Sequence, residues 1–543
     1  MYSSLYPEFF NDVFGPVMQP GSSSHTAGPC RLGYLASTLL GEAPCRVEVL
    51  LDRSSSFSHT FGLMAEDSAM LAGGLGFLPD DRRLYQAKTI AHQLGVEFSY
   101  HFGEMKESTH PNAVKFILTG ESGRRVSLVG DSIGGGMVET QTIDGYPLRY
   151  KGDAYLLLIF DPQELLDDGQ QDGFSLTLPS LVVKGHSRAK GLGCMSYFLT
   201  ADPPDMELVR AAFPEHQIAM IRPVLPVLTR PERKPQLFDT MSRWREVAEQ
   251  RGISLWETAV QYEMDASGWN REQVLEMMHS IERTMYRSTH APYEKIAQAA
   301  ISPFKPDMAG EWAAHLASPR RISSDLTAQT IKWAYGAGAG IPGIEVVAGP
   351  MGSGGGYVHA ALWAVKEARG FSDDDLLRGL FIAAAIGVIA FSRTEPTGER
   401  IGCGGETGIC GAMSAAAITE MAGGTPQEVE NAASLLLQAV TGVPCDPIPG
   451  GFGQPCRSRI ITTTCMASVF ADLALAGRSA VLPLHEAIDV LDQVGRLLPS
   501  ELLCTSMGGA AIAPAALRQA EIYHTWQEQT DREGIDRPPG NLI

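Results

Sequence analysis

The sequence has no excess of basic residues and no long apolar run. It carries 43 Lys and Arg against 62 Asp and Glu, a net charge of −19. A surface of this sign repels phosphate backbones and anionic lipids, so we expect neither nucleic acid nor a membrane as a partner. The longest apolar run, residues 379–391, is too short to span a bilayer. It predicts a buried core helix that begins near Ser372.

The first residues lack the basic and apolar pattern of a secretory signal peptide. Nine cysteines occur, an odd number. Together these features predict a protein of the reducing cytoplasm, where thiols stay free for chemistry or packing. The hydrophobic content of 44% and the charged content of 19% are typical of a globular protein with a sizeable core. The length predicts about two to four domains.

The secondary-structure pattern changes along the chain. Strand-like segments lie at 46–52, 113–120, 154–160 and 180–185, and an amphipathic helix lies at 87–95. Beyond a Pro-rich stretch at 223–235, helical patterns dominate, with Gly252 and Gly268 as breaks. From about residue 300 the helices are rich in Ala and Gly, which indicates that they pack closely.

These patterns predict an α+β multidomain protein, with an N-terminal α/β domain followed by a mostly helical catalytic domain. The expected parts are 1–150 (α/β), 151–235 (a connecting region and linker), 236–515 (helical) and 516–543 (a polar tail). A regulatory role for the connecting region stays open, because no motif in it indicates one.

Two cysteines, Cys445 and Cys456, lie in a loop rich in Pro and Gly. Neither has the close Cys or His neighbour of a zinc site, and a reducing compartment disfavours a disulfide. Buried structural thiols and an iron–sulfur cluster remain as interpretations. Upstream, Cys403 lies in a Gly-rich loop before an Ala-rich helix, whose N-terminus stabilises a thiolate. Cys410 lies inside that helix, so packing is its favoured role.

Several stretches resemble the iron–sulfur-dependent L-serine dehydratases, with beta-like and alpha-like parts fused in a single chain. In order they are "PGSSSHTAGPCRLG" (20–33), "GGLGFLPDDRRL" (73–84), "HPN" (110–112), "SIGGG" (132–136), "CGGETGICGAMSAAA" (403–417), "VPCDPIPGGFGQPC" (443–456) and "LLCTSMGGAAIAP" (502–514). The resemblance implies that Cys403, Cys445 and Cys456 hold a [4Fe–4S] cluster with one open iron. It also implies an oxygen-sensitive lyase of amino-acid metabolism.

The same resemblance implies an active site. Hydroxyls and glycine N–H groups near a helix start can bind a carboxylate, and the expected substrate-binding residues are Ser22, Ser23, Ser24, Thr26, Ser132, Gly134, Gly135 and Ser353. Histidine has a pKa suited to removing the α-proton, and the candidate catalytic residues are His110, His25, Asn112 and His59.

One position departs from the family pattern. The histidine of the family's Gly-His-x-Thr-Asp motif falls on Met64, and the Thr-Asp falls on Glu66 and Asp67. Methionine cannot accept a proton, so one of the three candidate histidines must supply the base, or the substrate differs from serine. The loop at 348–356 also departs from the family, with extra glycines.

We therefore expect a [4Fe–4S]-dependent lyase that eliminates water from a β-hydroxy amino acid, with L-serine giving pyruvate and ammonia. Two alternatives stay open. One is elimination or isomerisation of another β-substituted amino or hydroxy acid, and the other is a cluster-based sensor without activity. The expected partners are a small amino-acid substrate and a second copy of the chain in a homodimer.

Overall fold

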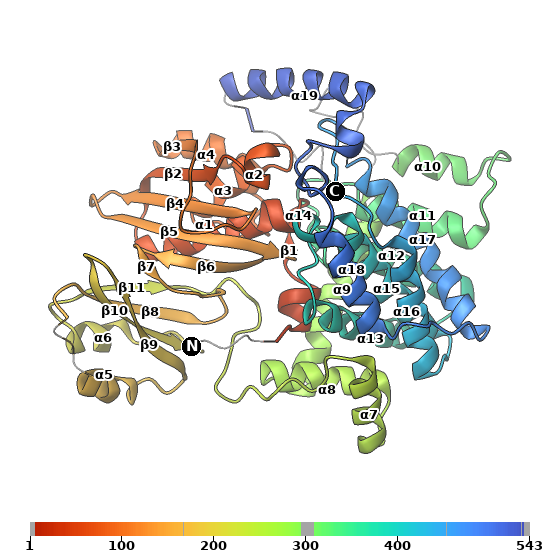
Figure 1. Cartoon of the computed structure of the whole chain (residues 1–543), viewed down its shortest axis with the longest axis horizontal. Helices are drawn as coiled ribbons and strands as arrows, with labels where there is room; N and C mark the ends of the chain where they lie inside the picture. The colour runs from red at the N-terminus through yellow and green to blue at the C-terminus, as the bar shows by residue number, and fades with distance from the viewer. Residues whose placement is uncertain are drawn as a thin grey trace.

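A sheet-containing part lies beside a helical part (Figure 1). The computed structural model describes residues 6–164, 166, 168–294, 309–451, 453–533 and 535–536. Most of the N-terminal chain forms two sheets, and most of the chain beyond residue 240 is helical. The predicted α+β class is confirmed.

Six strands form the larger sheet, in the order β3-β2-β4-β5-β6-β7. Their bounds are β2 Pro44–Asp52, β3 Glu97–Gly103, β4 Ala113–Gly120, β5 Arg125–Gly134, β6 Met137–Ile143 and β7 Tyr146–Pro147. β2 and β3 pair in parallel, and the other neighbouring strands are antiparallel. Along β4, Val114, Phe116 and Leu118 are buried and alternate with partly exposed residues, so one face of the sheet carries the core.

Four helices accompany this sheet: α1 (Gly28–Leu40), α2 (Ser56–His59), α3 (Glu66–Gly74) and α4 (Ala87–Leu94). Helix α1 packs on β4 and β5, and α3 packs on α1 and β2. A Cβ on Gly33 would lie 2.7 Å from Gly74 N, and one on Gly73 would lie 2.1 Å from Cys30 O. No side chain fits at this crossing, so the glycines set the distance between α1 and α3.

A smaller four-stranded sheet has the order β11-β8-β10-β9. Its elements are β8 Tyr155–Asp161, α5 Asp168–Ser175, β9 Leu181–Ala189, β10 Gly193–Thr200, α6 Met206–Ala212 and β11 Gln217–Ile221. This β-α-β-β-α-β succession is the ferredoxin-like arrangement. The unit has a small core of its own, which includes Leu157, Phe174, Phe198 and Phe213.

The helical part contains most of the remaining elements. They are α7 Met241–Arg251, α8 Leu255–Ser267, α9 Arg271–Glu294, α10 Ala309–Leu316, α11 Asp325–Ala337, α12 Gly354–Arg369, α13 Asp373–Phe391, α14 Gly398–Ile401, α15 Cys403–Met421, α16 Pro426–Val440, α17 Cys456–Leu475 and α18 Leu484–Arg496. Gly252 and Gly268 take positive φ directly after α7 and α8, which confirms both predicted breaks. Ser372 caps α13 in a capping box with Asp375, as its sequence predicts.

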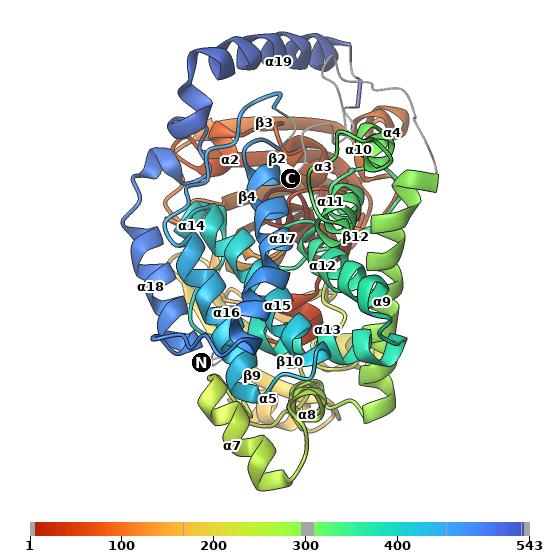
Figure 2. The same ribbon diagram turned by 90° about the vertical axis from the view of Figure 1, so that its right-hand side faces the viewer.

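Helix α15 lies at the centre of the helical part, where α12, α13, α16 and α17 surround it (Figure 2). Every residue of α15 except Glu420 is buried. Such a helix needs small residues where its neighbours approach: a Cβ on Gly411 would lie 2.7 Å from Leu436 and 2.9 Å from Thr463. The Ala- and Gly-rich composition is therefore a packing requirement.

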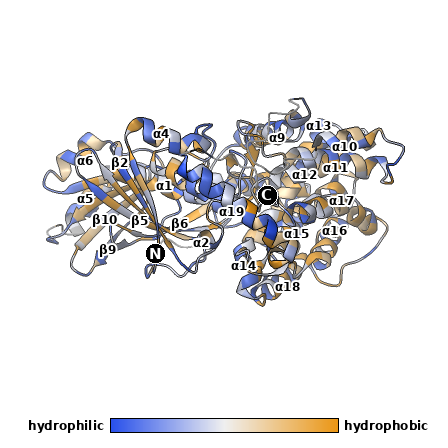
Figure 3. Cartoon of the chain, turned by 90° about the horizontal axis from the view of Figure 1, so that it is seen from above, coloured by the Kyte–Doolittle hydropathy of each residue, from blue (hydrophilic) through white to orange (hydrophobic). Residues whose placement is uncertain are grey.

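Both ends of the described chain cross to the opposite part. The turn Phe9–Val13 lies in the helical part, where Phe9 N–H donates to Glu263 at 2.8 Å. Strand β1 (Val17–Met18) pairs with β12 (Val346–Val347). Helix α19 (Pro514–Arg532) forms most of the polar tail and returns to the sheet-containing part, where Tyr523 donates to Gly62 O at 2.9 Å. Figure 3 shows α19 as a largely hydrophilic helix over the boundary between the two parts.

Four predicted strands and one predicted helix are confirmed as β2, β4, β8, β9 and α4. The Pro-rich stretch at 223–235 has no helix or strand, as expected of a linker. It is nevertheless held in place, because Val227 N–H donates to Asn11 Oδ1 and Arg233 pairs with the buried Glu8.

One helix of the described part, α17, is long and apolar enough to cross a membrane by length and composition, with 33% of its most apolar window buried. A core helix of a globular protein passes the same test, and α17 packs against α12, α15 and α16.

The glycine crossing of α1 and α3 gives a first prediction. The Gly33→Ala change should lower the free energy of unfolding by about 1–3 kcal/mol, because the new methyl must push α3 away. The matched control is Gly173→Ala on α5, where no atom lies within 4 Å of the new Cβ. The control should be neutral or up to about 1 kcal/mol more stable. If both variants change the unfolding free energy equally in chemical denaturation, then the close contact between α1 and α3 does not require glycine.

Candidate active site

The three predicted cluster cysteines converge within the helical part. Cys403 is the first residue of α15 and Cys456 the first of α17. Cys445 lies in the loop between α16 and α17. All three are buried, and the thiol of Cys456 is a hydrogen-bond neighbour of both other thiols. Two of the thiols therefore lie at helix N-termini, where free N–H groups and the helix dipole favour anions.

A fourth thiol, that of Cys504, joins this group as a neighbour of Cys445. The backbones of the two residues are tied: Cys504 N–H donates to Cys445 O at 2.7 Å, and Cys445 N–H donates to Leu502 O at 2.8 Å. Cys504 takes φ = +58°, a left-handed conformation that is uncommon for a residue with a side chain. The "LLCTSMGG" stretch was the signal for this residue in the sequence, but its cysteine was not predicted to take part.

The surroundings of the thiols are buried and include the guanidinium of Arg459. A hydrogen bond with Cys456 and burial raise the pKa of the Cys403 thiol well above its usual value. Burial likewise raises the pKa of Glu406, in the first turn of α15, well above its usual value. Arg459 donates to Asp446 at 2.7 Å and brings a positive charge near Cys403 and Cys456. Without metal the thiols are protonated, and a metal that binds them must displace those protons.

The serine-rich segment lies between the two parts of the molecule. Ser23–Ala27 forms a π-helical turn that leads directly into α1, and Ser22 caps this turn by accepting from His25 N–H at 3.1 Å. Thr26 donates to Met64 O at 2.7 Å, and Ser23 donates to Pro350 O at 3.3 Å.

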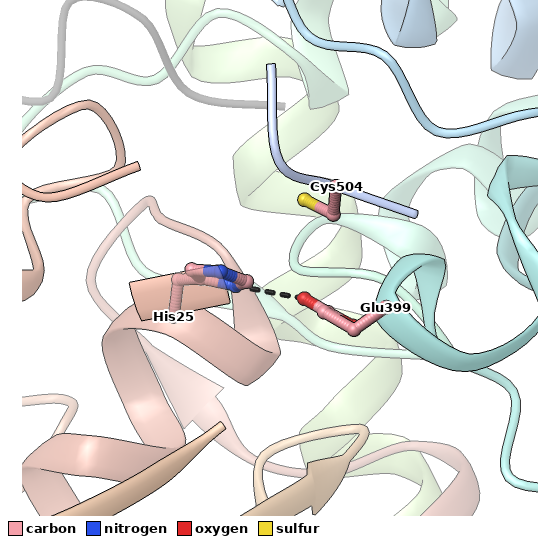
Figure 4. A group of neighbouring side chains, drawn as sticks. All are labelled: His25, Glu399 and Cys504. Carbon is pink, nitrogen blue, oxygen red and sulfur yellow. Dashed lines mark ion pairs between the residues drawn. The ribbon is translucent and has the colours of Figure 1, made fainter. Parts of the chain in front are cut away.

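His25 forms a buried ion pair with Glu399 of α14 (Figure 4). His25 Nδ1 lies 2.9 Å from Glu399 Oε1, and Ser24 Oγ donates to the same oxygen at 2.8 Å. On the other side of the ring, His25 Nε2 lies 3.0 Å from Ser56 Oγ. Because Ser56 donates its own proton to Cys504 O at 2.7 Å, Nε2 must carry a proton.

The pair sets the charge of both groups. Burial opposes the charged form of His25, but the Glu399 carboxylate raises the pKa of His25 above its usual value. Burial likewise opposes the Glu399 carboxylate, yet the charge of His25 and the hydrogen bonds lower its pKa to about 2. His25 is therefore an imidazolium with both nitrogens engaged.

A second histidine group lies at the ends of β4 and β5. His110 Nε2 lies 2.8 Å from Glu395 Oε1, and Asn112 N–H donates to His110 Nδ1 at 3.1 Å. This pattern assigns the proton of the ring to Nε2. Ser132 links the group to the serine-rich turn, since Ser132 N–H donates to Asn112 O and Ser132 Oγ donates to Ser24 O at 2.7 Å.

Buried polar atoms without a protein partner gather here. Both side-chain atoms of Asn112 are unpaired although the residue is fully buried, and Thr397 Oγ1 and Glu399 Oε2 are also unpaired. A Cβ on Gly134 would lie 2.2 Å from Thr397, so the turn after β5 closely approaches α14. Buried polar groups normally have partners, and this set indicates the position of a polar ligand.

Of the remaining predicted residues, Gly135 and Ser353 lie near the polar group around Asn112, whereas His59 lies outside it. Gly135 follows Gly134 in the same turn, with φ = +59°. Ser353 is buried at the start of α12, in a loop that packs on the serine-rich turn, since a Cβ on Gly352 would lie 1.8 Å from Gly21 O. His59 is exposed and lines a pocket of about 440 Å³ with Thr505 and His524, outside the buried network.

Besides Cys504, sequence reasoning missed four side chains: Ser56, Glu66, Glu395 and Glu399. Glu66 accepts from Thr60 Oγ1 and from Met64 N–H, and burial raises its pKa to about 7. Met64 therefore contributes its backbone to the site, while its side chain lies in the core. Glu395 and Glu399 carried no motif in the sequence beyond nearness to Cys403, and Glu66 falls where the family pattern has a threonine. Cys410 packs as expected, and its thiol lies 3.0 Å from Gly349 O.

The His25–Glu399 pair gives a prediction for the metal-free protein. The Glu399→Gln change should cost about 3–5 kcal/mol of unfolding free energy, because it leaves a buried imidazolium unpaired. The contribution of Glu399 is present above about pH 4.5 and is lost as the pH falls toward 2. That of His25 is present below about pH 6.5 and is lost as the pH rises through its raised pKa.

The difference in unfolding free energy between wild type and Glu399→Gln should therefore be largest between about pH 4.5 and 6.5. Urea denaturation at a series of pH values measures it. The control is Glu282→Gln, which breaks the more exposed pair of Glu282 with His359 at 3.2 Å. If the difference in unfolding free energy does not change with pH, or if Glu282→Gln loses as much, then His25 and Glu399 do not stabilise the fold as a charged pair.

Comparison with known proteins places the chain in a family. A profile described as "Serine dehydratase alpha chain" matches residues 250–511. The chain is 28% identical over 280 residues to "Probable L-serine dehydratase, alpha chain" of Bacillus subtilis, which covers 51% of this chain and 92% of that protein. It is 33% identical over 172 residues to "Probable L-serine dehydratase, alpha chain" of Latilactobacillus sakei, covering 32% of this chain and 82% of that protein.

A beta chain matches as well. The chain is 33% identical over 153 residues to "L-serine dehydratase, beta chain" of Peptoniphilus asaccharolyticus, covering 28% of this chain and 68% of that protein. One polypeptide thus resembles two chains that are separate in these relatives. With its beta-like N-terminal part and its alpha-like helical part, the chain belongs to the serine dehydratase family of lyases.

Proposed function

We propose that this protein is a [4Fe–4S]-dependent lyase that eliminates water from a β-hydroxy amino acid, and that L-serine is its substrate, giving pyruvate and ammonia. The observation that carries the proposal is the convergence of Cys403, Cys445 and Cys456 next to the His25–Glu399 pair. The names of the related L-serine dehydratase chains support serine as the substrate.

The residues fit such a cluster. Cys403, Cys445 and Cys456 would hold it, because thiolates are the usual ligands of [4Fe–4S] clusters. The free N–H groups that start α15 and α17 can donate to its sulfides, and Arg459 offsets its negative charge. Held by these three thiolates, a bound cluster would supply an iron with an open position that could act as a Lewis acid on the substrate's hydroxyl.

The protein's own groups support binding of an amino acid. The imidazolium of His25 attracts a carboxylate, and the hydroxyls of Ser24 and Ser132 lie within the same hydrogen-bonded network. The unpaired amide of Asn112 offers both a donor and an acceptor to a zwitterion. A pocket of about 510 Å³, lined by Gly134, Glu395 and other residues, lies beside this network.

The two histidines support different roles. His110 is neutral in its hydrogen-bond pattern, with a lone pair on Nδ1 and its proton held toward Glu395. It therefore suits removal of the α-proton after Asn112 N–H releases Nδ1. His25 has no free lone pair while it is paired with Glu399. An acid and a base in one site are usually two titratable groups, one kept charged and the other kept neutral by their surroundings.

A second candidate function is elimination from another β-substituted amino or hydroxy acid. Met64 occupies the place of the family's histidine, and the loop at 349–354 is packed too tightly for larger residues at Gly352 and Gly354. A different pocket shape would change the side chain that is accepted while the cluster chemistry stays the same.

The main prediction concerns pyruvate formation. Full-length protein reconstituted with iron and sulfide without oxygen should form pyruvate from L-serine, and Cys445→Ala should lose both the cluster absorbance and the activity. The control is Cys465→Ala, a partly exposed thiol on α17 that should change neither. An intact cluster with no pyruvate from serine would favour the second candidate, or a sensor without activity if no β-substituted acid reacts.

A further prediction separates the two histidines. His110→Gln should lower kcat by about 10²–10⁴-fold with a smaller effect on KM, as expected for loss of a general base. Asn112→Ala should act mainly on KM, because the amide binds substrate. Steady-state kinetics on cluster-matched preparations provide the measurement, and an unchanged kcat in His110→Gln would assign the base elsewhere.

A further inference from the structure

One short segment of the helical part supplies a carboxylate to both histidines of the site. Glu395 lies just before α14, and Glu399 lies within it. Glu399 pairs with His25, and Glu395 pairs with His110. Both histidines belong to the sheet-containing part, so each pair crosses the boundary between the two parts of the molecule. Residues 395–399 therefore fix the partner of each histidine.

The two pairs differ in their access to water. The side chains of His25 and Glu399 are 0% and 2% exposed, whereas those of His110 and Glu395 are 8% and 24% exposed. Glu395 also lines the pocket of about 510 Å³ beside the site. A fully buried pair keeps its charges, because neither charge is stable there alone, but a pair at a pocket can change its protonation state during a reaction. The pair of His110 and Glu395 is therefore the one suited to proton transfer.

Hydrogen bonds hold Glu395 by both of its carboxylate oxygens. Its Oε1 lies 2.8 Å from His110 Nε2, and its Oε2 accepts from Arg400 Nε at 3.0 Å. Because Asn112 N–H donates to His110 Nδ1 at 3.1 Å, the ring proton lies on Nε2, between the ring and Glu395. A carboxylate in this position orients the ring of a histidine and stabilises its charged form, as the aspartate of a Ser-His-Asp triad does.

We propose that Glu395 is a positioning residue for His110 in the elimination. The inference rests on the proposed function, in which His110 is the base. Nδ1 takes the α-proton, the electrons of the Cα–H bond form the Cα=Cβ double bond, and the Cβ–O bond breaks to release hydroxide. The Glu395 carboxylate stabilises the imidazolium that results. Nδ1 then gives the same proton to the hydroxide, so that water forms and His110 returns to its neutral form.

Two other charged groups lie close to this pair. Arg400 on α14 offsets part of the charge of Glu395, which allows the neutral ring of His110 to persist between turnovers. Asp131 on β5 also lies near His110, but Gln141 donates to its carboxyl at 2.7 Å, and burial raises its pKa. Both ring nitrogens of His110 are engaged by other groups. Asp131 therefore does not hold the ring, and it offers a matched control.

The test compares Glu395 variants in the reconstituted full-length protein. Glu395→Ala removes both the charge and the acceptor, and it should lower kcat for pyruvate formation about 10–100-fold with little change in KM. Glu395→Gln has nearly the same size as the wild-type side chain and keeps an acceptor oxygen, so its kcat should lie between those of Glu395→Ala and wild type. Glu395→Asp should recover part of the lost kcat, and the control Asp131→Asn should keep the wild-type value.

Nuclear magnetic resonance of the metal-free protein tests the same contact without turnover. The Nε2–H proton of His110, identified by its absence in His110→Gln, should lie downfield and exchange slowly with water in wild type and Asp131→Asn, because a carboxylate accepts it. It should move upfield in Glu395→Gln and exchange rapidly in Glu395→Ala.

An unchanged Nε2–H signal or an unchanged kcat in Glu395→Ala would overturn the inference, and so would an equal loss of kcat in Asp131→Asn. If wild type holds its cluster but forms no pyruvate from serine, the proposed function fails. That outcome is distinct, because the signal of His110 is recorded in protein without cluster or substrate.

Discussion

The buried pair of His25 and Glu399 connects the two parts of the molecule at the candidate site. Its members are far apart in the sequence, and each is almost inaccessible to water. Two opposite charges out of water require each other, because either one alone in such a place costs several kcal/mol. The pair therefore requires the serine-rich turn of the sheet-containing part to meet α14 of the helical part, and Ser24, Ser56 and Cys504 are aligned around that contact.

Close backbone contacts fix the positions of the turns and helix ends that carry the site, which the ion pair alone does not do. Gly33 and Gly73 set the crossing of α1 and α3, which fixes the turns that precede both helices. On the helical side, α15 and α17 begin at Cys403 and Cys456, so these two helices, which pack on each other, direct their N-termini to one point. The crossed chain ends, with Phe9 in the helical part and α19 on the sheet-containing part, hold the two halves together around the site.

Much of this was predictable from local pattern. The strands at 46–52 and 113–120, the capped core helix after Ser372 and the breaks at Gly252 and Gly268 follow from periodicity, capping and glycine alone. The cluster cysteines and His110 were recognisable because they lie in motifs. Glu399 and Glu395 were not, since a carboxylate carries no local signature and only its distant partner reveals its role.

The sequence by itself determined the fold class, the family and the thiols that can hold a cluster, because hydrophobic period, turn residues and motif spacing are all encoded within short stretches. Only the tertiary structure decided the charge of His25, the neutral form of His110 and the place of Cys504 among the other thiols. Burial and contacts between distant segments set these properties, and both come into existence only when the two parts pack together.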